Sequence, residues 1–225
     1  MKNQLIVFDI DDTLYNEVDY VKSGYREIAN YIEKKHHLTY IYDELLELFK
    51  QSSKNVFNRL FELLNIPYTS EDVMHLVNIY HDHIPNIQLS EEVKDTLLKL
   101  KEDYLLAIVS DGNYHVQKLK CEALKLKQYF SKIILTDELG KEYWKPSRLA
   151  FDILAREYQI PMENLFYVGD NPNKDFYISQ YGIKTIRYYN KEGIYFYDDY
   201  KENIKEDYRI DSINELIRLF HQINI

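Results

Sequence analysis

The stretch QLIVFDIDDTLY, residues 4 to 15, joins an apolar run to a cluster of carboxylates. Apolar side chains occupy successive positions from Leu5 to Phe8, instead of alternating with polar ones. This pattern is typical of a strand that is buried on both faces, as in a parallel sheet. Asp9 and Asp11 follow this run, and because they are two residues apart they point to the same side of an extended chain.

Five further apolar runs predict the other strands of a sheet. With the first run, they cover residues 4–8, 104–109, 132–136, 164–168, 184–189 and 208–210. Helical periodicity fills the gaps: one helix follows an N-cap at Ser90, and another begins near Pro146. A helix between them carries a stripe formed by Val116, Leu119, Ala123 and Leu126. This alternation predicts an α/β fold, with a Rossmann-like parallel sheet core and helices on both faces.

One region interrupts the alternation of strands and helices. Residues 15–85 contain several helical stripes and no convincing strand. We therefore expect an all-helical subdomain over residues 15–85, inserted into an α/β core domain formed by residues 1–14 and 86–225. The insertion leaves the sheet at the end of its first strand, which is the ligand-binding end in such folds.

Polar clusters follow four of the predicted strands. They are Asp9 to Leu14, Ser110-Asp111-Gly112-Asn113, Lys145-Pro146, and Gly169-Asp170 with Asp175 five residues further on. A parallel sheet brings them to one crevice. Several carboxylates lie close together only with a compensating cation, and a hard cation such as Mg²⁺ prefers oxygen ligands. An ammonium and a hydroxyl then remain to hold a phosphate dianion.

The segments FDIDDTLY, VSDGN, KPSRLAF and VGDNPNKD resemble, in order, the four signature motifs of the haloacid dehalogenase-like hydrolase superfamily. They span residues 8–175, and the helical insertion resembles the cap domain of that superfamily's commonest cap type. The resemblance implies a nucleophile at Asp9 that forms an aspartyl-phosphate. It also implies that Asp11 protonates the leaving oxygen and later activates water.

The resemblance implies the remaining site residues as well. Catalysis would depend on Asp9, Asp11 and Lys145, and the substrate would be bound by Ser110, Asp111, Gly112 and Lys145. Mg²⁺ would be held by Asp9, Asp11 through its backbone carbonyl, Asp170 and Asp175, unless Asp175 orients Lys145 instead. Asp111 and Asn113 have an alternative role as turn formers around Gly112, and Asp12 is expected to hydrogen-bond the turn.

The second carboxylate decides the predicted reaction. Dehalogenases of the superfamily lack it, since a halide leaves without a proton, so Asp11 favours phosphate esters. We expect a magnesium-dependent phosphatase of small phosphorylated metabolites, such as a sugar phosphate, phosphoglycolate or a nucleoside monophosphate. A phosphonate-cleaving enzyme with Lys22 or Lys54 in the cap, a phosphomutase, and a non-catalytic member that binds a metabolite or a partner are the alternatives.

Composition limits the setting and the partners. The 225 residues carry a net charge of −9, which disfavours a nucleic-acid surface. The longest apolar stretch has six residues, whereas a membrane span needs about 20, so we expect no membrane segment. The single Cys121 excludes an intramolecular disulfide, and no signal peptide is evident, so a cytoplasmic location is expected. Both a monomer and a homodimer remain open.

Overall fold

The computed structural model describes residues 2–200 and 204–223. It divides into two compact units, one formed by Met1–Glu17 with Gln88–Ile225 and the other by Val18–Ile87. The sequence predicted an insertion over residues 15–85, and its assignment as a cap stays a prediction.

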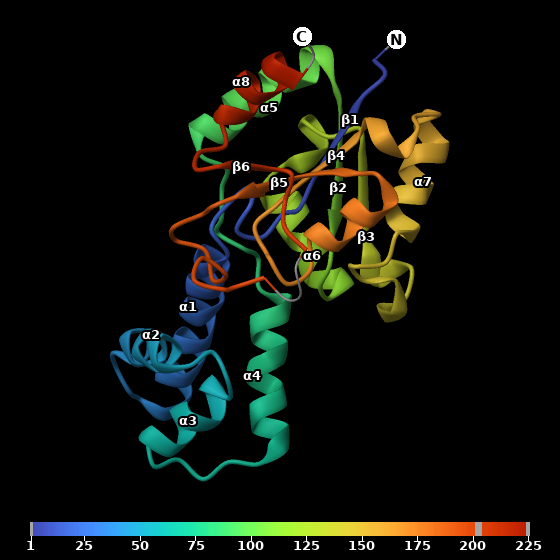
Figure 1. The fold of residues 1–225 in the computed structure, drawn as a ribbon. Coiled ribbons are helices and arrows are strands. Elements are labelled where there is room, and N and C mark those ends of the chain that lie inside the picture. The colour runs from blue at the N-terminus through green and yellow to red at the C-terminus, as the bar shows by residue number, and fades with distance from the viewer. Residues whose placement is uncertain (1, 201–203, 224–225) are drawn as a thin grey trace. The chain divides into compact units, whose positions relative to one another are not determined.

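A six-stranded parallel sheet forms the centre of the first unit (Figure 1). Its order is β3-β2-β1-β4-β5-β6, so the first strand lies inside the sheet. The bounds are Leu5–Phe8 for β1, Leu105–Ser110 for β2, Lys132–Leu135 for β3, Leu165–Gly169 for β4, Lys184–Tyr188 for β5 and Tyr208–Ile210 for β6. All six predicted strands and the α/β class are confirmed.

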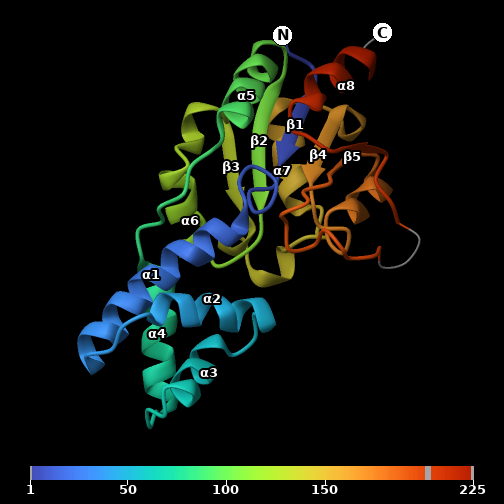
Figure 2. The same cartoon turned by 90° about the vertical axis from the view of Figure 1, so that its left-hand side faces the viewer.

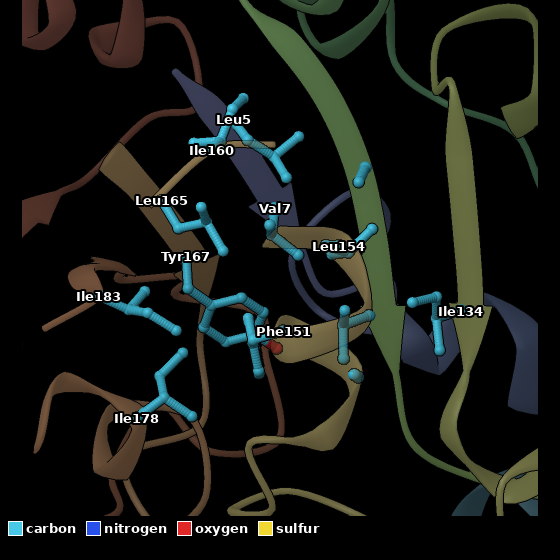
Figure 3. Close-up of a cluster of buried hydrophobic side chains, with 13 residues drawn as sticks. Leu5, Val7, Ile134, Phe151, Leu154, Ile160, Leu165, Tyr167, Ile178 and Ile183 are labelled. Atoms are coloured by element: carbon cyan, nitrogen blue, oxygen red, sulfur yellow. The ribbon is translucent and has the colours of Figure 1, made fainter. Parts of the chain in front are cut away.

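Helices cover both faces of this sheet, as expected (Figures 1 and 2). On one face, Phe151 and Leu154 of α7 (Leu149–Tyr158) belong to a buried cluster with Val7 and Tyr167 (Figure 3). On the other face, α5 (Glu91–Asp103) lies beside α8 (Glu215–Ile223) (Figure 1). Alternate strand residues serve the two faces, which explains why the strands are apolar at successive positions.

Two helix boundaries test the sequence signals. Ser90 caps α5, because its hydroxyl accepts the Val93 N–H at 3.2 Å, as predicted. The prediction of a helix start near Pro146 was wrong by a few residues. The N–H of Ser147 donates to the Trp144 carbonyl at 2.9 Å, so a turn precedes α7. Short 3₁₀ segments cover Leu126–Gln128, Thr136–Glu138, Lys141–Tyr143, Met162–Asn164 and Phe176–Tyr181.

The helix α6 (Tyr114–Ala123) has a different buried face from the predicted one. The sequence stripe pointed to Leu119 and Ala123 as core positions, but both are half-buried. The buried residues of α6 are Val116, Gln117, Lys120 and Cys121. A glutamine and a lysine therefore lie on the inner face of this helix, and the apolar stripe did not reveal them.

The second unit is entirely helical. There is no strand among residues 18–87, all of which the structure describes. Its helices are α1 (Glu17–His36), which begins at the last residue of the first unit, α2 (Ile41–Gln51), α3 (Val56–Leu63) and α4 (Ser70–Asp82). They enclose their own apolar core, which includes Ile28, Ile32, Leu45, Leu60 and Leu76. Across the described part of the chain, no helix combines the length and apolarity that a bilayer crossing requires.

Candidate active site

The carboxyl ends of three neighbouring strands bring the predicted residues together. β1 pairs in parallel with β2 on one side and with β4 on the other. Asp9 follows β1, Ser110 ends β2, and Asp170 follows β4. In a parallel sheet these ends share one edge, so the three side chains are placed in one crevice by the strand pairing itself.

Asp9 is held by donors on both of its oxygens. Oδ1 accepts the Ser110 hydroxyl at 2.8 Å and the Ile10 backbone N–H at 2.8 Å. Oδ2 accepts the Lys145 ammonium at 2.9 Å. Burial raises the pKa of Asp9, and the charge of Asp175 adds to the rise, although Lys145 opposes it. The carboxylate is therefore fixed in orientation and poorly solvated, which suits a nucleophile.

Lys145 is buried, and its ammonium group donates hydrogen bonds to three side chains. Its Nζ lies 2.8 Å from Asp175 Oδ1, 2.9 Å from Asp9 Oδ2 and 2.6 Å from the Tyr167 hydroxyl. Burial alone lowers the pKa of Lys145, but the charges of Asp175 and Asp9 outweigh it and hold the pKa well above its usual value. Lys145 is a permanent cation here. Tyr167 was not predicted as a site residue, because in the sequence its ring is indistinguishable from the other large side chains of a buried strand.

Asp111 and Asn113 use their side chains to build the loop after β2. Asp111 Oδ1 accepts the Thr136 hydroxyl at 2.7 Å and the backbone N–H of Lys145 at 3.1 Å. Asn113 caps α6 by accepting the Val116 N–H at 3.2 Å. The turn-forming interpretation thus holds for both side chains, and Asp111 also fixes the backbone of Lys145. Substrate contact by Asp111 or Gly112 stays a prediction.

Three of the four predicted metal ligands form one group. Carboxylate oxygens of Asp9, Asp170 and Asp175 all lie within 4.8 Å of one another. Burial, together with the charges of Asp175 and Asp9, raises the pKa of Asp170 well above its usual value. So many oxygens around one point, with a single lysine to balance them, fit a hard divalent cation. The donor set is all oxygen and therefore fits Mg²⁺. The part of the Asp11 carbonyl stays a prediction.

Asp175 is the most deeply buried carboxylate of this group, and both of its oxygens accept hydrogen bonds. Its Oδ2 accepts the Asn171 N–H at 2.9 Å, while Oδ1 receives Lys145, and the side chain has no exposed surface. A Cβ on Gly169 would lie only 2.4 Å from Asp175 Oδ2. Only glycine permits that approach, which gives a physical reason for the glycine at the end of β4. The contact with Lys145 favours the orienting role of Asp175, one of the two roles that the sequence left open, and the role itself stays a prediction.

The carboxylate of Asp11 faces a different set of partners. Oδ1 accepts Lys120 Nζ at 2.7 Å and the Tyr15 hydroxyl at 2.6 Å, and Oδ2 accepts Gln117 Nε2 at 2.9 Å. Burial acts to raise the pKa of Asp11, but the charge and hydrogen bond of Lys120 and the other donors outweigh it, so the pKa is lowered. Gln117 and Lys120 were missed from the sequence.

Asp12 ties the same loop to a distant segment. It is buried in the left-handed region at φ 51°, and its carboxylate accepts the N–H groups of Glu17 and Ile194, each at 2.8 Å. The Asn190 side chain donates to its carbonyl at 3.0 Å. The prediction that Asp12 hydrogen-bonds the turn is confirmed. Its contact with Ile194 also joins this loop to the segment that follows β5.

Comparison with known proteins agrees with this geometry. The family described as haloacid dehalogenase-like hydrolase matches residues 6–188. A glyceraldehyde 3-phosphate phosphatase of Pyrococcus furiosus is 30% identical over 233 residues, which cover 98% of this chain and 94% of that protein. Pyrophosphatase PpaX of Bacillus mycoides is 24% identical, and the match covers 100% of both chains. The structure of the HAD-hydrolase YfnB from Bacillus subtilis, bound to magnesium, has a TM-score of 0.67 at 16% identity and covers 100% of both chains.

Proposed function

The chain belongs to the haloacid dehalogenase-like hydrolases and is a phosphatase of that family, and we propose that it cleaves small phosphate monoesters through an aspartyl-phosphate on Asp9. One observation carries the proposal. Asp9 accepts hydrogen bonds from Ser110 and Lys145. A second carboxylate, Asp11, lies two residues away and accepts a hydrogen bond from Lys120. This arrangement supports the proposal, because the reaction needs a nucleophile, two phosphoryl-binding donors and a proton carrier close together.

In the first step, Asp9 attacks the phosphorus atom. The bond from phosphorus to the ester oxygen breaks, and Asp11 gives a proton to that oxygen, which leaves as an alcohol. In the free enzyme, Lys120 and the other donors outweigh burial and lower the pKa of Asp11. Asp11 therefore takes up this proton when the anionic phosphate group binds beside it. The Ser110 hydroxyl and the Lys145 ammonium, which contact Asp9 in the resting site, hold the phosphoryl oxygens. Their fixed positions stabilise the charge that develops on those oxygens.

In the second step, a water molecule attacks the aspartyl-phosphate. Asp11, now a carboxylate, takes a proton from that water, and the bond between phosphorus and the Asp9 oxygen breaks. Inorganic phosphate leaves, and Asp9 returns to its starting state. Asp11 is thereby protonated again, which balances the protons of the two steps.

A divalent cation completes the proposed site. Asp9 and Asp170 would hold Mg²⁺ beside Asp175, and the ion would neutralise phosphoryl oxygens during the transfer. Lys145 supplies only one positive charge against these three carboxylates. A doubly charged phosphate group would add to that excess, so the arrangement supports a metal requirement.

For the substrate, we propose a small phosphorylated metabolite with an alcohol leaving group. The Pyrococcus furiosus relative is named for glyceraldehyde 3-phosphate, which makes this three-carbon ester the first compound to test. We further propose that the helical unit, Val18–Ile87, is the cap that selects the leaving group.

The test is phosphate release from 4-nitrophenyl phosphate and from glyceraldehyde 3-phosphate, with Mg²⁺ or with a chelator. We expect turnover with Mg²⁺ alone, and a loss on the order of 10⁴-fold or more in kcat for Asp9→Asn. Asp95→Asn, an exposed carboxylate on α5, is the matched control and should behave like the wild type. Full activity in Asp9→Asn, or turnover that persists without metal, would contradict the mechanism.

A further inference from the structure

Two polar side chains of α6 are buried against the catalytic loop. Gln117 is 1% exposed and Lys120 is 3% exposed, whereas Lys118, on the same helix, lies in solvent. Gln117 and Lys120 are three residues apart and therefore share a helix face. Lysine is rarely buried unless its charge is paired, so the position of Lys120 calls for a specific partner.

That partner is the carboxylate of Asp11. Lys120 Nζ lies 2.7 Å from Asp11 Oδ1, and the Tyr15 hydroxyl lies 2.6 Å from the same oxygen. The nearest Glu17 oxygen is 4.0 Å from Lys120, so the closer ion pair is the one with Asp11. A carboxylate oxygen has two lone pairs, and both lone pairs of Oδ1 are occupied by these donors.

Gln117 fixes the other oxygen and connects two motifs. Its Nε2 lies 2.9 Å from Asp11 Oδ2, 2.9 Å from Ser110 Oγ and 2.9 Å from the Asp111 carbonyl. Gly112 makes room for this side chain, because a Cβ there would lie 3.2 Å from Gln117 Cγ at a φ of +122°. One lone pair of Oδ2 is left, and it belongs to the less crowded of the two Asp11 oxygens.

We propose that Lys120 is a positioning residue, which locks Asp11 so that Oδ2 exchanges the proton with the leaving oxygen and with water. This inference rests on the proposed phosphatase mechanism and deepens it. A carboxylate held only by its own side-chain torsions would sample several orientations, and proton transfer requires one within hydrogen-bond reach of the ester oxygen. Lys120 holds Oδ1 and Gln117 holds Oδ2, and because both side chains belong to one helix they restrict the rotation of the carboxylate.

The experiment compares leaving groups. Wild type, Lys120→Met, Lys120→Gln, Lys120→Arg and the exposed control Lys118→Met are assayed on 4-nitrophenyl phosphate, phenyl phosphate and glyceraldehyde 3-phosphate. A 4-nitrophenolate leaves readily without a proton, whereas an alkoxide does not. For Lys120→Met and Lys120→Gln we expect kcat losses of about 10²-fold on the alkyl ester and about 10-fold or less on the nitrophenyl ester.

The remaining readouts separate positioning from a structural role. KM should change by less than about 3-fold, Lys120→Arg should recover most of the kcat lost on the alkyl ester, and Lys118→Met should match the wild type. An equal loss on all three leaving groups, no loss at all, or no recovery with arginine would overturn the role of Lys120. The glutamine variant keeps the test available if the methionine variant does not fold. Failure of the phosphatase mechanism has a different signature, since it would appear in the wild type and in Asp9→Asn.

Discussion

Asp9 and Asp11 lie two residues apart on one loop, yet their surroundings shift their pKa values in opposite directions. Burial raises the pKa of Asp9, and the nearby charge of Asp175 contributes to the rise against the opposing effect of Lys145. Burial acts in the same direction on Asp11, but Lys120 and the donors around it lower the pKa. The difference comes from the elements behind each residue, since β4 and its loop present carboxylates whereas α6 presents a lysine and an amide.

This contrast divides the site into two halves. The β4 half consists of Asp9, Lys145, Asp170 and Asp175, with three carboxylates close together around one lysine. The α6 half consists of Asp11, Gln117 and Lys120, with one carboxylate and one lysine. An excess of negative charge favours a bound cation, and a balanced pair favours a fixed orientation. The proposed metal binding at Asp9 and the proposed proton exchange at Asp11 therefore have separate surroundings, although the two residues are only two positions apart.

The largest effect is expected from removing the cation of the β4 half. Lys145→Met would leave Asp9 and the unexposed Asp175 without their shared partner. Breaking a buried pair in this way costs about 3–5 kcal/mol, so the free energy of unfolding of the metal-free protein should fall by that amount. Urea unfolding measures it, and phosphatase activity should be lost at the same time.

Lys174→Met is the matched control for this experiment. The Lys174 side chain is 44% exposed, and its Nζ lies 4.0 Å from Asp111. Its removal should change the free energy of unfolding by no more than about 0.5 kcal/mol. If Lys145→Met is as stable as this control, the carboxylates of the β4 half are not ionised together, and the proposed charge excess is wrong.

A smaller effect with the opposite sign is expected for Asp170→Asn. Because burial and neighbouring carboxylates raise the pKa of Asp170, its folded value exceeds its unfolded one. Its stabilising contribution is then complete below the unfolded pKa and is lost as the pH rises through the folded pKa. At neutral or higher pH the metal-free variant should be more stable than the wild type, by about 1–2 kcal/mol.

Magnesium reverses this order. Excess Mg²⁺ should stabilise the wild type, by about 2.7 kcal/mol at a hundredfold excess over Kd, and should stabilise Asp170→Asn much less. Thermal unfolding with and without Mg²⁺ measures both effects, with Asp95→Asn as the exposed control. Equal stabilisation of the two proteins by Mg²⁺ would place the ion away from Asp170.

The two halves also differed in how far the sequence could predict them. Asp9 and Asp170 follow apolar strands, and parallel pairing alone brings the strand ends together, so the β4 half was largely predictable. The α6 half was not. Its ion pair joins Lys120 to a residue 109 positions away, and no local pattern encodes such a partner.

The second reason why the α6 half was not predicted is that the apolar stripe indicated the wrong buried face of α6. The apolar stripe assumed a helix that continues to Leu126, whereas α6 ends at Ala123 and Leu126 begins a 3₁₀ segment. The apolar stripe contains neither Gln117 nor Lys120, although both are buried on the inner face of α6. A lysine and a glutamine three residues apart beside Val116 and Cys121 are the signal that could have identified this face. Apolar periodicity cannot distinguish a buried, paired lysine from a solvated one.

The smallest predicted effect tests whether Lys120 also neutralises the charge of Glu17, whose nearest oxygen lies 4.0 Å from Lys120 Nζ. Burial, the charge of Asp11 and that of Asp12 raise the pKa of Glu17 to about 8 from 4.5, although Lys120 opposes this rise. Because the folded pKa is the higher one, stability from Glu17 is complete below about pH 4.5 and is lost as the pH rises to about 8. The Glu17 side chain is 29% exposed, so solvent screening reduces the effect of its charge on stability.

Glu17→Gln should therefore equal the wild type in stability near pH 4.5 and exceed it above pH 8. We expect a gain of no more than about 1 kcal/mol in the free energy of unfolding, measured by urea titration across this range in the absence of metal. Glu122→Gln, an exposed carboxylate on α6, should show no such trend. A difference that does not depend on pH would mean that Lys120 neutralises Glu17 as well as Asp11, and that the α6 half carries two ion pairs on a single lysine. A gain that follows the pH as described would instead assign the charge of Lys120 to Asp11, the pairing on which its positioning role depends.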